Sequence, residues 1–558
     1  MNNFEAVGLK HDRFLILCSI LYVILPPVIF SVGWIKPLIA VPVSLIFLFA
    51  AYKIYSDLCS ENEIMIFKVP GKFWLYALLI ICAWVLCSGI GGFSFQNGDF
   101  VARNPTYRDL CDYSWPVKYD LANQSEAAQK ILGSGSVVFA YYFSWWLPPA
   151  LVSKIFNFAQ TGRDICVYIW AVIGMLLVFY NLCRYLKKAS LITLIIFIFF
   201  SGLDIIGYII YHPVIIPGRH IEWWTGFIQY SSMTTLLFWV FNQSIAAHLI
   251  VILLLQLKDG KNALALSSLT FAFSPWVAIG IIPIALNSVF IDFKNFKNFK
   301  DKLKDVFTFT NISVPLAMLL IYGLFYTGST GGQRGLGGFT FVNKNFYDFI
   351  VRYSLFCLLE FGIYFIILGK SVKNYKFYYV VLAELILIPL YELASNLIMR
   401  ASIPAVFCLM VYVIKFLLED NNKLLIRKRI LIIVLILGAC TPFMEFTRCW
   451  VYTALHYGSR YYGSKIPAIM ESKNIYESIY NAAEVSSDEE KKIIRKAVDK
   501  SIEKFAAKMR QRLLREEIYS FGRIAADDEG LINLVKNQFF MYDYENRPFF
   551  KYVGKMPE

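Results

Sequence analysis

FWLYALLIICAWVLCSGI, residues 73–90, is a continuous apolar run, and GGFSFQNGDFVARNPTYRDLCDYSWPV, residues 91–117, follows it directly. The second stretch gathers five ionisable side chains among aromatic ones: Asp99, Asp109, Asp112, Arg103 and Arg108. Ionisable groups just beyond a membrane span usually have a function. We therefore expect Asp99 to lie at the membrane face of a catalytic cavity.

Composition supports a membrane protein. The 558 residues are 58% hydrophobic and 17% charged, with a mean hydropathy of +0.54. Soluble domains are typically about 45–50% apolar and about 25% charged. Repeated apolar runs of about 18 residues or more are typical of a polytopic helical membrane protein.

The net charge of +14 does not indicate nucleic-acid binding, because the basic residues cluster in short loops between apolar runs. Those loops are 184–188, 294–304, 370–376 and 423–429. This pattern is typical of cytoplasmic loops, which also attract anionic lipid headgroups. The eleven cysteines form no CxxC pair or metal-ligand spacing, and we interpret them as small apolar filler.

The apolar runs predict an all-α protein with about thirteen transmembrane helices. We expect two short crossings in 262–290, which Ser274–Pro275 interrupts, and an interfacial or re-entrant helix in 137–157, which Pro148–Pro149 interrupts. The other eleven crossings are expected near 14–31, 38–55, 73–90, 164–183, 189–210, 231–256, 306–326, 349–368, 377–394, 401–418 and 430–447. With the basic loops inside, the N-terminus is cytoplasmic, and the Asp99 loop and the C-terminus are extracytoplasmic.

The chain divides into a transmembrane domain, 1–447, and a C-terminal segment, 448–558. The first contains the first large extracytoplasmic loop, 91–136. The second includes SSDEEKKIIRKAVDKSIEKFAAKMRQRLLREEIYSF (486–521), whose mixed charges and Ser/Asp start predict an amphipathic soluble helix. We expect a small extracytoplasmic α-helical domain.

Several polar residues on the predicted outer side have two interpretations each. Asp204 lies inside an apolar run and serves either a helix–helix hydrogen bond or a site. Glu222, after His220 and before Trp223–Trp224, belongs either to a solvated aromatic belt or to a site. Arg400 is either an interfacial anchor that reaches the headgroups or a bidentate phosphate ligand. Arg334 lies in the glycine-rich loop 328–338. This loop lacks the spacing of a phosphate-binding P-loop, and we interpret it as a lid.

This set of groups suits sugar transfer from a lipid-phosphate carrier. A carboxylate would deprotonate the acceptor hydroxyl, arginines would stabilise the departing phosphate, and aromatic rings would stack on sugars. We assign catalysis to Asp99, Glu222, Asp109 and His220. We assign substrate or phosphate contacts to Arg103, Asn104, Arg334, Arg400, Asp204, Trp223, Trp224, Gln229 and Tyr230.

The architecture resembles the GT-C superfamily of membrane glycosyltransferases. The segments GGFSFQNGDFVARNPTYRDL…WPV, FSGLDIIG, HIEWW…QYSSMTTLLFWV and NLIMRASIPA are similar to a bacterial group of GT-C-like proteins, in which QN-x-D precedes HN or RN and then DL. The resemblance implies a catalytic Asp in the first large loop, at the position of Asp99. It also implies a polyprenyl-phosphate-sugar donor and a glycan, lipid or protein acceptor.

One departure from the family concerns metal. The paired acids that several GT-C families carry are absent, so Asp99 stands alone unless Glu222 or Asp204 serves as the second acid. This leaves open whether a divalent metal takes part. The alternative function is a transporter or flippase of lipid-linked or polar solutes, which the helices interrupted by proline favour. The expected location is a bacterial inner membrane.

Overall fold

The computed structural model describes residues 3–60, 71–212, 215, 218–290, 304, 306–328, 337–342, 344–393, 397–462, 487, 489, 491–492, 518–524 and 529–557. Within these residues, eight helical segments are long and apolar enough to cross a membrane. They are His11–Trp34, Pro37–Cys59, Gln160–Leu186, Leu191–Tyr211, Met233–Gln256, Phe309–Gly328, Phe346–Val372 and Leu425–Ala454. The predicted all-α membrane class is therefore supported by the helices themselves.

Five of the thirteen expected segments form apolar helices of 10–17 residues: Gly71–Cys87, Ala263–Ala272, Pro275–Val289, Tyr378–Leu390 and Ile403–Leu418. These helices are shorter than the about 20 residues of a full crossing.

The elements in the membrane part follow in this order: α1 (Asn3–Trp34), α2 (Pro37–Cys59), α3 (Gly71–Cys87), α7 (Gln160–Leu186), α8 (Leu191–Phe199), α9 (Asp204–Tyr211), α10 (Met233–Gln256), α11 (Ala263–Ser268), α12 (Pro275–Phe290), α14 (Phe309–Met318), α15 (Leu324–Gly328), α16 (Phe346–Cys357), α17 (Ile363–Leu368), α18 (Tyr378–Leu387), α19 (Leu397–Ala401), α20 (Ile403–Leu418), α21 (Leu425–Gly438) and α22 (Cys440–Tyr462). α10 is the most buried of the eight long segments, with 94% of its apolar window inside the protein.

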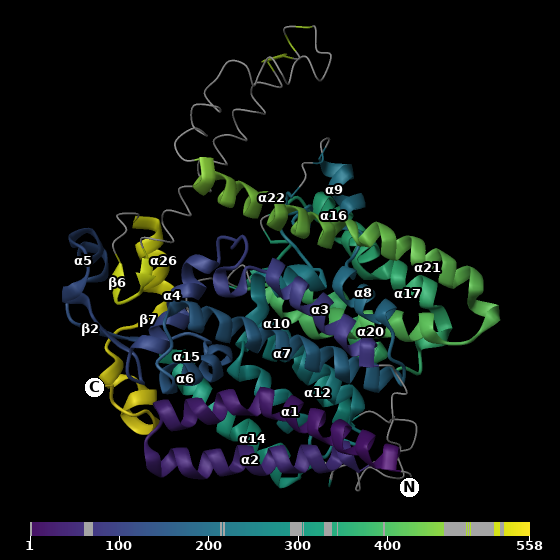
Figure 1. Ribbon diagram of the computed structural model, residues 1–558. Coiled ribbons are helices and arrows are strands. Elements are labelled where there is room, and N and C mark those ends of the chain that lie inside the picture. The colour runs from purple at the N-terminus through teal and green to yellow at the C-terminus, as the bar shows by residue number, and fades with distance from the viewer. Residues whose placement is uncertain are drawn as a thin grey trace.

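The long helices lie side by side, with the N-terminus at one end of the bundle and the C-terminus at the other (Figure 1). Arg184 joins several helices at the N-terminal end. Its Nε donates to Asp12 Oδ1 at 3.1 Å, and its Nη2 donates to the carbonyl of Leu58 at 2.9 Å. Its Nη1 donates to Gln256, at the end of α10. The start of α1 and the ends of α2, α7 and α10 therefore meet at this end.

Residues 263–290 form the interrupted pair of short helices that the Ser274–Pro275 break predicts. α11 ends before the break, and α12 begins at Pro275. α12 returns to the end where α11 began, since an added Cβ on Gly260 would lie 3.1 Å from the carbonyl oxygen of Ser288. The segment therefore enters and leaves at one end of the bundle.

The segment 137–157 also breaks at its prolines. α6 (Leu147–Ile155) has nine residues and carries proline in its first turn, where a missing N–H costs little. A helix of this length is too short to cross a bilayer.

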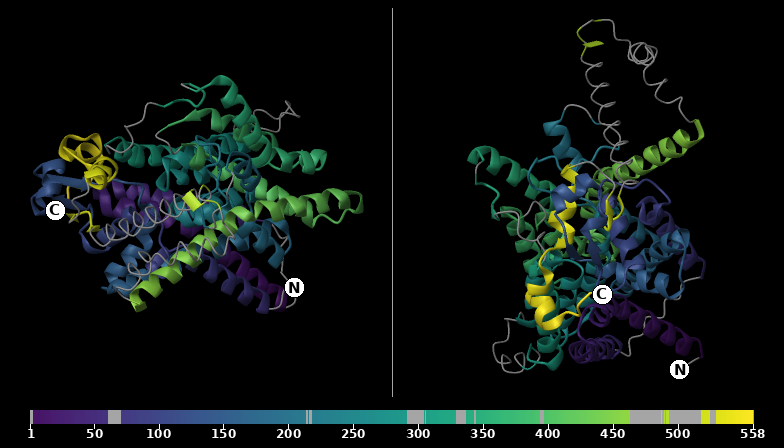
Figure 2. Two further views of the ribbon diagram at one scale, coloured as in Figure 1. Left: turned by 90° about the horizontal axis from the view of Figure 1, so that it is seen from above. Right: turned by 90° about the vertical axis from the view of Figure 1, so that its left-hand side faces the viewer.

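A small layer covers the C-terminal end of the bundle. It contains α4 (Phe100–Asp112), α5 (Glu126–Leu132), α26 (Glu529–Phe539) and a three-stranded antiparallel sheet. The sheet has the order β1 (Lys118–Asp120), β2 (Ser136–Phe139), β7 (Phe540–Met541), with Val138 opposite Met541. Figure 2 also shows the yellow C-terminal segment beside the blue segment of α5 and β2.

The C-terminal segment 448–558, for which a small α-helical domain is expected, also includes strands in its described part. Its described part contains β5 (Ile518–Ser520), β6 (Arg523–Ile524) and β7 besides α26, and α22 continues from the membrane part to Tyr462. β7 pairs with β2 because Phe540 and Met541 are buried against that strand. The predicted amphipathic helix 486–521 lies almost entirely outside the described residues. A further short pair joins β3 (Gly338–Phe339) to β4 (Tyr391–Glu392).

Candidate active site

Asp99 stands directly before α4 and pairs with Arg103 one turn later. Arg103 Nη2 donates to Asp99 Oδ2 at 2.7 Å, and Asn97 Oδ1 accepts from the Asp99 backbone N–H at 3.0 Å. The Asp99 side chain is 44% exposed, whereas that of Arg103 is 7% exposed. Residues spaced i, i+4 lie on the same face of a helix, so this ion pair can be predicted from the sequence of 91–117 alone.

Arg103 is buried with hydrogen-bonding capacity to spare. Its guanidinium lies over the rings of Phe241 and Phe100, 5.1 and 5.6 Å from their centroids. Its Nη1 has no hydrogen-bond partner among the described residues. Burial and the nearby charge of Arg400 lower the pKa of Arg103, against the opposing effect of Asp99. A buried, unpaired guanidinium N–H is costly unless a ligand accepts from it.

Arg400 approaches the same place from α19. Its charge acts on Arg103 and on Tyr141, and its Nε is buried without a partner in the described part of the chain. α19 is held by α12, because Gly280 packs directly against the carbonyl of Ala401. Two arginines with unused N–H groups thus lie within electrostatic reach of each other and of Tyr141.

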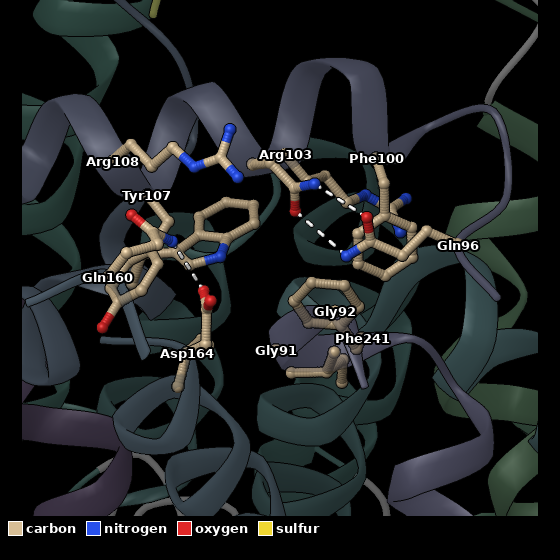
Figure 3. A pocket seen from close by; sticks show the side chains of 14 residues that line it. Gly91, Gly92, Gln96, Phe100, Arg103, Tyr107, Arg108, Gln160, Asp164 and Phe241 are labelled. Carbon is tan, nitrogen blue, oxygen red and sulfur yellow. Dashed lines mark hydrogen bonds between the residues drawn. The ribbon is translucent and has the colours of Figure 1, made fainter. Parts of the chain in front are cut away.

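A cavity of about 250 Å³ lies beneath α4. Figure 3 shows its polar side chains facing one another across the space. Gln96 and Asn104 form a reciprocal amide pair, at 2.8 and 3.3 Å. The lining consists of Ile90, Gly91, Gly92, Gln96, Phe100, Arg103, Asn104, Tyr107, Arg108, Trp146, Gln160, Asp164, Val167 and Phe241. Arg103 therefore belongs to both the arginine pair and the cavity.

The opposite wall comes from the start of α7. Gln160 Nε2 donates to Asp164 Oδ1 at 2.8 Å. The Tyr519 hydroxyl, in β5, donates to Gln160 Oε1 at 3.1 Å. The guanidinium of Arg108 lies 4.4 Å from the centroid of the Tyr519 ring. The C-terminal segment therefore fixes the residues of this wall.

Asp109 lies apart from the cavity, in a fully buried junction. Its Oδ2 accepts from the Tyr119 hydroxyl at 2.7 Å and from the backbone N–H of Phe521 at 2.9 Å. Burial raises its pKa to about 7, against the opposing effect of these hydrogen bonds. The carboxyl joins α4 to β1 and to the β5–β6 turn.

A second polar group surrounds Glu222 in the loop before α10. Glu222 is fully buried and accepts from Gln229 Nε2 at 2.7 Å and from the Ser232 backbone N–H at 2.9 Å. His220 Nδ1 lies 3.0 Å from Glu445 Oε1, on α22. Burial raises the pKa of Glu222 to about 7. Burial lowers the pKa of His220, but the hydrogen bond with Glu445 and the charge of Glu222 outweigh it, so the pKa of His220 is raised overall.

Glu445 closes this group from the membrane part. Its Oε2 accepts from Arg448 Nη1 at 2.8 Å and from Trp239 Nε1 at 3.1 Å. Trp239 stands beside Val240, where α10 is kinked, and Asn97 Nδ2 donates to the neighbouring Phe238 carbonyl at 2.8 Å. The loop of Asp99 and the group around Glu222 thus meet on the same kink.

Asp204 is fully buried at the break between α8 and α9. Its Oδ2 accepts from Ser201 and Thr441, each at 2.9 Å. Its carboxyl also contacts that of Glu360, which accepts from Trp224 Nε1 at 3.4 Å. Asp204 therefore makes helix–helix hydrogen bonds, as one of the two interpretations of this residue expects.

The structure separates the predicted residues into two groups. Asp99, Arg103, Asn104 and Arg400 lie around the cavity and the arginine pair. Glu222, His220, Gln229, Asp204 and Trp224 belong to the buried acid network. The remaining predicted residues lie elsewhere: Asp109 is buried against Tyr119 and Phe521, Trp223 is 47% exposed, Tyr230 donates to the Leu385 carbonyl, and Arg334 is outside the described residues.

Some residues of these groups were missed from the sequence. Asp164 and Gln160 carry a weak signal, since they are the polar residues that open an apolar run. Glu445 and Arg448 are spaced i, i+3 within the last run, a pattern typical of an ion pair. Glu360 has no signal of its own, because its partner Asp204 is 156 residues away in the chain.

Within the described part of the chain, no three His, Cys, Asp or Glu side chains converge as metal ligands. No residue is therefore assigned to a metal below. No family model, curated protein or solved structure matches this chain, so its functional interpretation rests on the geometry above.

Proposed function

We propose that this protein is a membrane glycosyltransferase that moves a sugar from a polyprenyl-phosphate carrier to an acceptor hydroxyl. The observation that carries the proposal is that Arg103 and Arg400 lie within electrostatic reach of each other, and that each has a buried N–H that lacks a partner among the described residues. Guanidinium groups bind phosphate with paired, directional hydrogen bonds. A phosphate held between them would satisfy both orphaned donors.

The phosphate would also change the state of Asp99. In its absence, Arg103 is the ion-pair partner of Asp99 at 2.7 Å. The monoanionic phosphodiester of the donor competes for the same guanidinium, and this competition frees the carboxylate to accept a proton. Asp99 then deprotonates the acceptor hydroxyl, whose oxygen forms the new bond to the anomeric carbon. The bond from that carbon to the phosphate oxygen breaks, and the two arginines stabilise the departing polyprenyl phosphate.

The membrane arrangement that accompanies this proposal is of the GT-C type. The eight long segments and the five shorter apolar helices would together make thirteen crossings. The basic loops favour a cytoplasmic N-terminus, which puts the arginine pair on the extracytoplasmic side of a bacterial inner membrane. There the polyprenyl tail would lie among the helices, and a glycan, lipid or protein would supply the acceptor hydroxyl.

A transporter is the second candidate, and a different observation favours it. Asp204, Glu222, Glu360 and Glu445 are buried carboxyls, and α10 is kinked next to Trp239, which donates to Glu445. Buried acids and broken helices within the membrane are typical of ion-coupled transport. The arginine pair and Asp99 take no part in that network, whereas glycosyl transfer uses both.

The test is turnover of a panel of polyprenyl-phosphate sugars by the purified protein and its Asp99→Asn variant. We expect wild type to release polyprenyl phosphate from one donor, and the variant to be slower by about 100-fold or more, because general-base catalysis typically contributes that much. Asp259→Asn is the matched control, because Asp259 is an exposed acid whose ion-pair partner is Lys261.

In sealed vesicles of known orientation, acceptor added outside should be used only when the outer face of the cell membrane is exposed. Equal rates for wild type and Asp99→Asn, or no consumption of any donor, would contradict glycosyl transfer. Uptake of a solute into vesicles without release of polyprenyl phosphate would favour the transporter.

A further inference from the structure

The mechanism above uses Arg103 and Asp99 but leaves the cavity beneath α4 without a role. We propose that this cavity binds the single sugar ring that is esterified to the donor phosphate. The inference rests on the proposed phosphate site at Arg103 and Arg400, and it adds the residues that hold the sugar. The ligand class is a sugar 1-phosphate unit, with its phosphate at the arginines and its hydroxyl groups in the cavity.

The volume suits a ligand of this size. The cavity measures about 250 Å³. Pockets for drug-sized ligands typically measure about 300–1,000 Å³. A single ring therefore fits, whereas an oligosaccharide would have to extend beyond the cavity.

The polar lining matches a ring of hydroxyl groups. Asp164 and Gln160 form a carboxylate–amide pair on one wall, and Gln96 and Asn104 form an amide–amide pair on the other. Carboxylates accept from hydroxyl groups, and amides both donate and accept. Neighbouring sugar hydroxyls make the same kind of paired contact. A purely apolar ligand, such as the polyprenyl chain, would leave the remaining hydrogen-bonding capacity of these pairs without water or a substitute for it.

Aromatic side chains supply the remaining surface. Trp146 and Phe241 line the cavity with their rings 5.8 Å apart and nearly perpendicular. Apolar faces of this kind pack against the C–H faces of a sugar ring, while the polar pairs hold its edge. The mixture of a few directed polar groups with aromatic walls is typical of a small-molecule site.

Charge places the anionic end of the ligand. Two guanidinium groups line the cavity, those of Arg103 and Arg108, against the one carboxylate of Asp164. Arg103 is buried, lines the cavity and has an Nη1 without a partner among the described residues. Since Arg103 lines the cavity, a phosphate bound at its Nη1 has its ester-linked sugar next to the cavity.

Equilibrium binding to the full-length protein in detergent tests the inference without any turnover. The probes are inorganic phosphate and a panel of sugar 1-phosphates, measured by saturation-transfer NMR and titration calorimetry. We expect at least one sugar 1-phosphate to bind wild type about tenfold or more tightly than phosphate does. Asp164→Asn should remove that preference and leave phosphate binding unchanged, since it replaces one carboxylate acceptor oxygen with an N–H donor and changes no arginine.

Two further variants make the result interpretable. Gln160→Ala removes the other member of the pair without changing charge, and it replaces Asp164→Asn if that variant does not fold. Asp259→Asn makes the same chemical change at an exposed acid and should keep the full preference.

The inference is overturned if no sugar 1-phosphate binds more tightly than phosphate, or if the preference survives both Asp164→Asn and Gln160→Ala. Failure of the proposed function has a different signature. In that case the preference for a sugar 1-phosphate persists and depends on Asp164, but no polyprenyl-linked donor is consumed.

Discussion

Asp109 illustrates how a single residue links the site to the stability of the protein. Its pKa is raised to about 7 by burial, so the folded protein holds this proton more tightly than the unfolded chain, in which an aspartic acid titrates near 4. Stability from this group is complete below about pH 4 and is lost as the pH rises to about 7. The slope is at most about 1.4 kcal/mol per pH unit.

Asp109→Asn should remove this pH dependence. The asparagine amide oxygen can still accept from the Tyr119 hydroxyl and the Phe521 N–H, so we expect the variant to keep the fold. The thermal midpoint of wild type should fall more between pH 5 and pH 8 than that of the variant. Parallel pH profiles would show that Asp109 does not titrate in this range. Scanning fluorimetry of both proteins in detergent gives the measurement.

For single residues, the sequence predicts contacts between side chains that are close in the chain and misses contacts between distant ones. The contact of Asp99 with Arg103 follows from their i, i+4 spacing on α4. The sequence also gave reason to expect that Arg400 binds an anion, but not that it lies beside Arg103, because the two are almost 300 residues apart. Asp164 was missed because a lone acid at the start of an apolar run is more often a solvated helix end.

Among the elements, α12 and α19 determine where Arg400 lies. An added Cβ on Gly280 would lie 1.9 Å from the carbonyl oxygen of Ala401, which is a backbone atom and cannot rotate away. Gly280→Ala should therefore push α19 aside, at a cost of about 1–3 kcal/mol. Because Arg400 precedes Ala401, we expect phosphate binding to weaken severalfold, by calorimetry.

Gly323→Ala is the control for this substitution, since nothing lies within 4 Å of its added Cβ. It should leave both the thermal midpoint and phosphate binding near their wild-type values. If Gly280→Ala behaves in the same way, α12 does not fix the position of α19.

Helices were easier to predict than strands. Long apolar runs identify the helices, and Pro148–Pro149 and Ser274–Pro275 mark true interruptions. The sheet β1-β2-β7 was missed because its strands have two to four residues, and the pairing of β2 with β7 joins residues about 400 positions apart. Such short strands carry too few residues for an alternating pattern to stand out.

For the whole molecule, residues 540–558 tie the site layer to the first helices. Beyond β7, the Lys36 N–H donates to the Val553 carbonyl at 3.0 Å, and the Lys555 N–H donates to the Trp34 carbonyl at 2.7 Å. A chain without residues 540–558 loses these bonds and the β2–β7 pairing. It keeps the eight long apolar segments, so it should still insert into the membrane.

We expect this truncated chain to have a lower thermal midpoint and a layer around α4 that protease cleaves readily. Limited proteolysis and fluorescence-detected gel filtration of membrane extracts measure both effects. Met541→Leu, a change of similar volume in β7, should match wild type. A truncated chain as resistant as wild type would mean that the C-terminal segment does not stabilise the site.

The pairing of β7 with β2 also has a consequence for biosynthesis. β2 leaves the ribosome about 400 residues before its partner strand, so the β2–β7 pairing cannot form until that much more of the chain has been made. Until then, Phe139 has no β7 to cover it, and α4 lacks the Phe521 N–H that binds Asp109. Contacts between residues so far apart in sequence form slowly. A nascent chain that has not yet reached β7 would therefore occupy the membrane with its helices in place but its site incomplete.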